Sequence, residues 1–204
     1  MALVDRINAG ARRIPSGVLY IAGALVAGWY FYLALSGGMG VDPVKALEHR
    51  YGELALQLLI AGLVITPLRR FAGINLIKFR RALGLVAFFF LLAHLLVWAI
   101  LDVQTLGRVW ADIVKRPYIT IGMVGFALLM PLAVTSNDWS IRKLRAGWRR
   151  LHRLVYPAVI LGGVHYVMVV KGWQIEPLIY LAVILALLAV RTRRIRARMV
   201  AQTG

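Results

Sequence analysis

The residues of this sequence best able to do chemistry are histidines set in apolar surroundings. There are four histidines and no cysteine, so disulfides, iron–sulfur clusters and thiolate-ligated metal sites are excluded. His94 lies inside one long apolar run and His165 inside another. His152 lies among arginines at the start of the run that contains His165. A single histidine of this kind could simply hydrogen-bond a neighbouring helix. Two histidines at the same depth in the membrane would weaken this simple explanation.

The apolar runs are long enough to be membrane spans. Of the 204 residues, 61% are hydrophobic, and the mean hydropathy is +0.75. A helix that crosses a membrane needs about 20 mostly apolar residues. Segments that qualify are about 14–36, 52–68, 82–101, 117–135, 151–170 and 175–190. We therefore expect an all-α integral membrane protein, a six-transmembrane-helix bundle that forms one domain over residues 1–204.

The basic residues alternate between the two sides of these spans. With the N-terminus inside, 19 of the 25 Lys and Arg residues fall on the cytoplasmic side and six on the other. Positively charged loops favour the cytoplasm, so both termini are expected there. The net charge of +17 is then explained by topology and by contact with anionic lipid, and we expect no nucleic-acid partner.

This orientation allows the depth of each histidine to be estimated. The third and fifth spans both run outward from the cytoplasm. His94 lies 13 residues beyond Arg81, and His165 lies 15 residues beyond Arg150. At a rise of about 1.5 Å per residue, the depths are about 20 Å and about 22 Å. Two imidazoles at one level are a common axial pair for haem iron. The sequence therefore predicts haem between helices 3 and 5, the helices of the third and fifth spans, ligated by His94 and His165.

The other histidines have different surroundings. His152 is near the cytoplasmic face and, on an ideal helix, points about 140° away from His165. The matching depth of helix 3 holds Arg80 and Arg81 instead of a histidine. One haem is therefore better supported than two, and His152 remains open as a second haem ligand or a flavin contact. His49 precedes the second span, and we expect it in a solvated loop.

Three glycines are candidates for packing against the haem. Gly162 and Gly163 precede His165, and Gly84 lies in the third span. A glycine lets a flat macrocycle approach the backbone closely. The alternative is close helix packing, which small residues also allow in membranes.

Short stretches spread over nearly the whole chain resemble a known family. They are Gly40–Lys45, Ile65–Leu68, Arg80–Leu85, Arg116–Gly122, Thr135–Ser136, Leu151–His152 with Val155–Tyr156, His165–Tyr166 and Pro177–Tyr180. In order and spacing they are similar to the haem-binding membrane subunits of the bacterial periplasmic methionine sulfoxide reductase system (MsrQ, also called YedZ). That family belongs to the ferric-reductase-like transmembrane superfamily.

The resemblance implies a multi-pass electron conduit of the bacterial inner (cytoplasmic) membrane that carries haem b and FMN. Its partner would be a periplasmic molybdopterin enzyme that reduces methionine sulfoxide in oxidised proteins, so this chain would be an electron-transfer subunit and substrate reduction would occur in the partner. The family's haem-ligand positions map onto His94, His165 and, as an open case, His152. In the two-haem NADPH oxidases of the superfamily both helices carry paired histidines, and helix 3 here departs from that pattern.

The residues leave the electron donor open. The sequence has no glycine-rich dinucleotide fingerprint, so electrons would come from a cytosolic NAD(P)H flavin reductase or from the quinone pool. FMN near the basic loops is expected to contact Arg70, Arg81, Trp148 and His152, through cations for its phosphate and rings for stacking. The same residues could serve only topology and anchoring. Two alternatives are a b561-like cytochrome that oxidises quinol for another periplasmic reductase, and a membrane protein whose histidines have no redox role.

Overall fold

Every regular element in the described part of the chain is a helix. The computed structural model describes residues 2–170 and 174–203, with backbone only for residue 2 and residues 192–203. The longer helices are α1 (Ala2–Arg13), α2 (Gly17–Leu35), α3 (Pro43–Phe71), α4 (Arg80–Leu96), α5 (Leu106–Lys115), α6 (Pro117–Val134), α9 (Val155–Val169) and α10 (Ile175–Thr203). Shorter pieces are η1 (Ile77–Phe79), the π-helical η2 (Val97–Val103), α7 (Asp138–Leu144), α8 (Ala146–Leu151) and η3 (His152–Leu154).

Four helical segments of the described residues are long and apolar enough to cross a membrane. They are Gly17–Leu35, Pro43–Phe71, Ile77–Val103 and Pro117–Val134. They correspond to the first four of the expected spans. The segments expected as the fifth and sixth spans are helical as well, and they contain α9 and the first part of α10.

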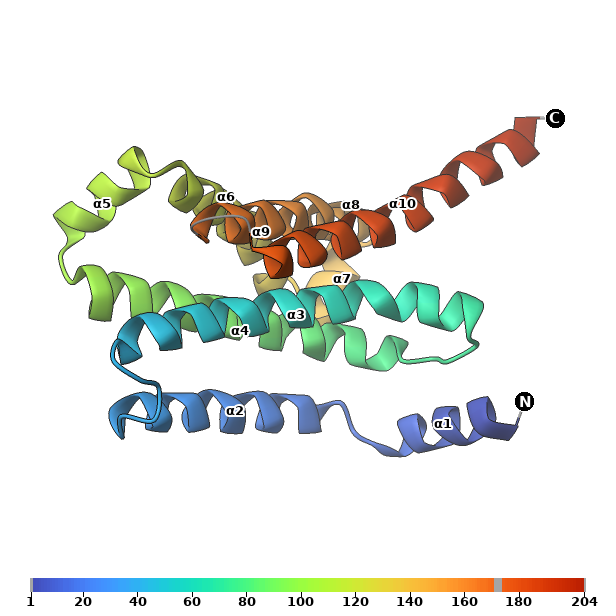
Figure 1. Cartoon of the computed structure of the whole chain (residues 1–204). Coiled ribbons are helices and arrows are strands. Elements are labelled where there is room, and N and C mark those ends of the chain that lie inside the picture. Colours follow the sequence, from blue (N-terminus) through green and yellow to red (C-terminus); the bar gives the residue numbers. More distant parts are fainter. Residues whose placement is uncertain (1, 171–173, 204) are drawn as a thin grey trace.

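The helices form a bundle around two antiparallel pairs. Helix α3 runs along α4, and α6 runs along α9. The α3–α4 pair lies between α2 on one side and the group of α6, α9 and α10 on the other (Figure 1). The loop between α3 and α4 and the helix α1 lie at the same end of the bundle (Figure 1). Because that loop region carries Arg69, Arg70, Lys78, Arg80 and Arg81, we call this the basic end.

Helix α3 begins nine residues earlier than the expected second span. Asp42 caps it by accepting a hydrogen bond from the Lys45 backbone N–H at 3.2 Å, and Pro43 fills the first helical position. Both are strong helix-start signals. The expected start at residue 52 was wrong because it followed hydropathy, which the charged first turns interrupt. His49 is therefore an exposed residue of α3, and its predicted place in a loop was also wrong.

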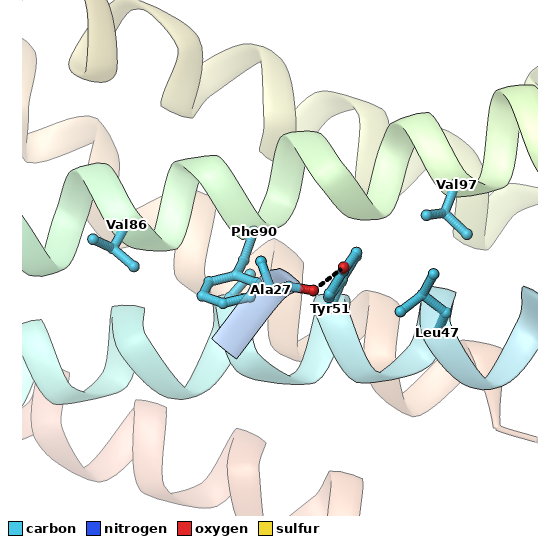
Figure 2. Packing of buried hydrophobic residues seen from close by; sticks show 7 residues of the cluster. Ala27, Leu47, Tyr51, Val86, Phe90 and Val97 are labelled. Carbon is cyan, nitrogen blue, oxygen red and sulfur yellow. Dashed lines mark hydrogen bonds between the residues drawn. The ribbon is translucent and has the colours of Figure 1, made fainter. Parts of the chain in front are cut away.

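Large apolar side chains hold α2, α3 and α4 together. Tyr51 of α3 packs against Phe90 of α4, with ring centroids 5.7 Å apart (Figure 2). In the same cluster, Leu47 of α3 lies opposite Val97, which follows α4. The Tyr51 hydroxyl donates a 2.7 Å hydrogen bond to the Ala27 carbonyl of α2, drawn as a dashed line in Figure 2. Because the tyrosine ring fills the core and its hydroxyl is satisfied, this residue ties α2 to the α3–α4 pair.

Several segments expected as loops contain helices. Helix α1 precedes the first span, α5 lies between the third and fourth, and α7 and α8 lie between the fourth and fifth. In α5 the residues Leu106, Trp110 and Val114 recur every fourth position and are all exposed, as in a helix that lies along a membrane surface. A search for spans misses these helices because their apolar residues cover only one face.

The expected fifth span starts with a change of helix type. His152 lies in the 3-10 turn η3, between α8 and α9, and Pro157 sits in the first turn of α9. A proline there loses no helical hydrogen bond, because the first turn has no partner for its N–H groups. The α-helix therefore begins at Val155, four residues after the expected start.

Candidate functional site

His94 of α4 and His165 of α9 lie close together in the half of the bundle away from the basic end. Their ring centroids are 6.3 Å apart and their ring planes meet at 80°. The two helices run in the same direction from the basic end, so similar distances along them lead to similar levels. The predicted match in level is thus confirmed by the short separation, although ligation of iron stays a prediction.

Each of these imidazoles is held through the same ring nitrogen. The Nδ1 of His94 lies 2.8 Å from the Glu48 carbonyl oxygen of α3, and the Nδ1 of His165 lies 2.7 Å from the Tyr118 carbonyl oxygen of α6. A carbonyl can only accept, so both Nδ1 atoms carry the hydrogen and donate it. Both Nε2 atoms then keep a free lone pair, and no hydrogen bond to either is found among the described residues.

This arrangement fits a metal shared by the two rings. A metal–imidazole nitrogen bond is about 2 Å long, so two ligands on opposite sides of one metal bring their ring centres to about 6 Å. Coordination sets the direction of each Nε2 but leaves the rings free to rotate about the bond, so the 80° between their planes is compatible. A donor set of two neutral imidazoles suits haem iron, whose other ligands come from the macrocycle.

The glycines closest to these rings are not the three that were predicted to pack against haem. A Cβ on Gly122 of α6 would lie 2.9 Å from His165 Nδ1, and a Cβ on Gly52 of α3 would lie 3.0 Å from His94 Nδ1. By contrast, Gly163 faces Ile184 and Leu181 of α10, and Gly162 faces Leu56 of α3. Gly84 has no protein atom of the described chain near its missing Cβ, and its contact with haem stays a prediction.

His152 lies apart from this pair, towards the basic end. Its Nδ1 is 3.1 Å from the Trp148 carbonyl oxygen, and its Nε2 is 3.4 Å from the Ser136 hydroxyl. Its ring stacks on Trp148 with a centroid distance of 3.8 Å and an interplanar angle of 25°. Its ring stacks on Trp148, and no second histidine ring of the described chain contacts it, so His152 lacks the paired arrangement of His94 and His165.

Two further residues predicted to contact FMN close the end of α6. The Trp148 Nε1–H donates to the Thr135 carbonyl at 2.9 Å, and the Arg81 Nε–H donates to the Ser136 carbonyl at 2.7 Å. Arg81 also forms an ion pair with Asp138 at 2.7 Å. Thr135 and Ser136 directly follow α6, so these side chains satisfy carbonyls of the chain just beyond the end of the helix. Arg81, Trp148 and His152 are therefore brought together around residues 135–138.

Arg70, the fourth predicted FMN contact, lies in a neighbouring cavity. This cavity of about 230 Å³ is lined by Thr66, Pro67, Arg70, Arg80, Tyr156, Val190 and Arg191. Arg191 donates to the Tyr156 hydroxyl at 3.0 Å and to the Leu63 carbonyl at 2.6 Å. Its Nε is buried and has no hydrogen-bond partner within the described residues. Three guanidinium groups around one cavity form a site suited to an anion.

Sequence reasoning missed several residues that shape these sites. The acceptors of the two Nδ1 hydrogens are backbone carbonyls, which carry no signal in the side-chain sequence. In the sequence, Arg191 is one of several arginines that follow the sixth span. It reaches the cavity because α10 packs against α3 and α9. Both features depend on which helices pack together, and the sequence does not show this.

Comparison with known proteins places the chain in a family. A family model described as ferric reductase like transmembrane component matches residues 50–163, more than half of the chain. The protein-methionine-sulfoxide reductase heme-binding subunits MsrQ of Brucella ovis, Brucella canis and Brucella suis are each 51% identical over 178 residues, which cover 87% of this chain and 81% of theirs. No solved structure matches. The chain therefore belongs to the ferric-reductase-like transmembrane family and, within it, to the MsrQ family of multi-pass membrane proteins.

Proposed function

We propose that this protein is a haem b electron conduit that passes electrons across the membrane to a periplasmic molybdopterin methionine sulfoxide reductase. The observation that carries the proposal is the pair of His94 and His165, held 6.3 Å apart with both Nδ1 atoms bonded to carbonyls. The Brucella relatives, which are heme-binding subunits of a methionine sulfoxide reductase, support the assignment. Reduction of the oxidised methionine then belongs to the partner.

The chain's own residues would hold and orient the group. A haem bound here supplies reversible one-electron transfer. His94 and His165 would bind its iron, and the helix pairs α3–α4 and α6–α9 hold their rings at a fixed separation. The carbonyls of Glu48 and Tyr118 hold each Nδ1 hydrogen, which raises the electron density that the ring can offer to iron.

The proposed topology has six spans with both ends of the chain in the cytoplasm. The helices in the last two segments run back and forth beside the α3–α4 pair, and α9 packs between α6 and α10. Helix α1 and the far end of α10 lie at the basic end, which agrees with an even number of crossings (Figure 1). Because positive loops favour the cytoplasm, the basic end would face inward and the His94–His165 pair outward. The pair would then be close to a periplasmic partner.

An inner carrier is needed because the histidine pair is far from the basic end. We propose that FMN fills this role and that its phosphate binds in the cavity of Arg70, Arg80 and Arg191. The buried Nε of Arg191, without a partner among the described residues, supports an anionic ligand, since leaving such a donor unpaired costs about 1–3 kcal/mol. The cavity of about 230 Å³ suits the phosphate end of the cofactor rather than all of it.

The stacked pair of Trp148 and His152 would lie near the flavin site. His152 is four residues before Tyr156, which lines the cavity, and Arg80 of the cavity is within electrostatic range of His152. The electron donor would be a cytosolic NAD(P)H flavin reductase or the quinone pool. Reduction of purified protein by each donor in turn separates the two, and quinol as the only effective donor would favour a b561-like cytochrome.

The topology is tested with reporter fusions. Fusions after Gly204 and within residues 136–149 should report a cytoplasmic location, and fusions within residues 102–116 a periplasmic one, because of the charge asymmetry between the loops. Paired alkaline phosphatase and fluorescent protein fusions measure this at each point. A periplasmic location for residues 136–149 would contradict the orientation.

The axial pair is tested by removing each ligand. His94→Ala and His165→Ala should each lower haem affinity by more than about ten-fold, because even outer partners of a metal-bound histidine contribute about 10–100-fold. Haem per chain and the low-spin visible spectrum of the purified protein measure the loss. His49→Ala, an exposed histidine on α3, is the matched control and should keep a full spectrum. Wild-type haem content in either ligand variant would refute the assignment.

The flavin cavity is tested by removing its charges one at a time. Arg70→Gln and Arg191→Gln should each weaken FMN binding by at least about ten-fold, the size expected for one hydrogen bond to a charged group. Titration of flavin-depleted protein with FMN measures the affinity. Arg69→Gln, next in sequence but outside the cavity lining, is the control. If Arg70→Gln binds FMN normally and Trp148→Ala does not, the site lies around residues 135–148 instead.

His152 is tested for iron ligation against a flavin contact. Because its Nδ1 donates to the Trp148 carbonyl and its ring stacks on Trp148, with no second histidine facing it, His152→Ala should leave the haem spectrum nearly intact while lowering bound FMN or slowing haem reduction by the cytosolic donor. Haem content, flavin content and stopped-flow reduction are measured together. Loss of about half the haem per chain, with the rest still ligated by two histidines, would show a second haem and contradict the single-haem proposal.

A further inference from the structure

The two ligand histidines are held by the same local arrangement, a backbone carbonyl and a nearby glycine, which occurs once in each helix pair. His94 donates to the carbonyl of Glu48, and the residue four positions after Glu48 is Gly52. His165 donates to the carbonyl of Tyr118, and the residue four positions after Tyr118 is Gly122. In both cases the glycine faces the ring that its helix has bound.

Helix geometry explains why a glycine is needed at that place. The carbonyl of residue i in an α-helix points towards residue i+4, whose Cβ leans back over the same turn. A ring that approaches the carbonyl from a neighbouring helix must therefore occupy the space of that Cβ. At Gly122 the Cβ would lie 2.9 Å from both Nδ1 and Cε1 of His165, and at Gly52 it would lie 3.0 Å from Nδ1 of His94. These separations are well inside van der Waals contact for carbon atoms.

We propose that Gly52 and Gly122 are positioning residues for the haem ligands. Each leaves one helical carbonyl open to a histidine of the neighbouring helix, which fixes the tautomer and turns Nε2 away from the helix towards the paired ring. The inference rests on haem ligation by His94 and His165 and extends it to two residues that touch neither iron nor substrate.

The proposal predicts an electronic effect as well as a steric one. A histidine that donates its Nδ1 hydrogen is a more basic ligand, which stabilises oxidised iron and lowers the reduction potential. Pushing the ring away from its carbonyl weakens that bond. The potential should therefore rise, and the spectroscopic signature of the low-spin iron should change with ring orientation.

Three other glycines offer matched controls, two of them on the same helices as Gly52 and Gly122. A Cβ on Gly62 of α3 would meet no atom within 4 Å, and a Cβ on Gly125 of α6 would make ordinary contacts at 3.6 Å. Gly23 of α2 is a control for crowding, because its Cβ would lie 2.6 Å from Val86 Cγ1 but near no histidine. Together they separate the effect of a methyl group in a helix from the effect of displacing a ligand ring.

The experiment compares alanine at each of the five glycines in the full-length protein purified with its haem. Gly122→Ala and Gly52→Ala should shift the low-spin electron paramagnetic resonance signal, raise the midpoint potential and lower haem per chain. Gly62→Ala, Gly125→Ala and Gly23→Ala should match the wild type in all three readouts. Gly52→Ala carries the milder crowding and repeats the test on the other helix pair if Gly122→Ala does not accumulate.

Three results would overturn the proposal. One is a wild-type signal and potential in both Gly52→Ala and Gly122→Ala. Another is an equal change in Gly23→Ala, which would indicate general repacking. The third is failure of both variants to accumulate while Gly23→Ala does, which would assign the glycines to folding. If His94→Ala and His165→Ala lose haem in the same set, the proposed function survives any of these, and if they keep haem it fails separately.

Discussion

Two hydrogen bonds, from His94 Nδ1 to the Glu48 carbonyl and from His165 Nδ1 to the Tyr118 carbonyl, set the geometry on which the site depends. Each bond crosses between two helices, so each requires its pair to stay in one register. In an apolar medium a lost hydrogen bond leaves polar groups without water to replace it. The α3–α4 and α6–α9 pairs are thereby held in place at the level where the two rings meet, 6.3 Å apart.

The rest of the bundle supports that register from its apolar surfaces. The cluster around Leu47, Tyr51 and Phe90 holds α3 against α4 and α2 within two turns of His94 (Figure 2). On the other side, Leu56, Val159 and Ile184 pack α3, α9 and α10 together, with Val159 and Ile184 fully buried. Dispersion contacts of this kind are individually small and large in sum, and they keep the rings where the hydrogen bonds can form.

The basic end follows a different physical rule, in which unpaired charges and carbonyls are collected near the membrane surface. Arg81 and Trp148 satisfy carbonyls directly after the end of α6, and Arg81 also pairs with Asp138. Arg70, Arg80 and Arg191 instead converge on one cavity from α3, α4 and α10. Arg81 is thus already neutralised by a carboxylate, whereas the three arginines of the cavity are available to an anionic cofactor or lipid headgroup. Only the available arginines support a binding site.

The sequence by itself determined the helical class, the first four spans and the matched level of His94 and His165. Each of these follows from local rules, since a span must satisfy its own backbone and rises a constant distance per residue. It also grouped Arg81, Trp148 and His152 as FMN contacts, which stays a prediction, and the fold gathers these three residues around residues 135–138. Only the tertiary structure decided which carbonyls hold the histidines, that Gly52 and Gly122 face them, and that Arg191 joins Arg70. These depend on which helices pair and at what register, and contacts between distant segments leave no periodic trace along one chain.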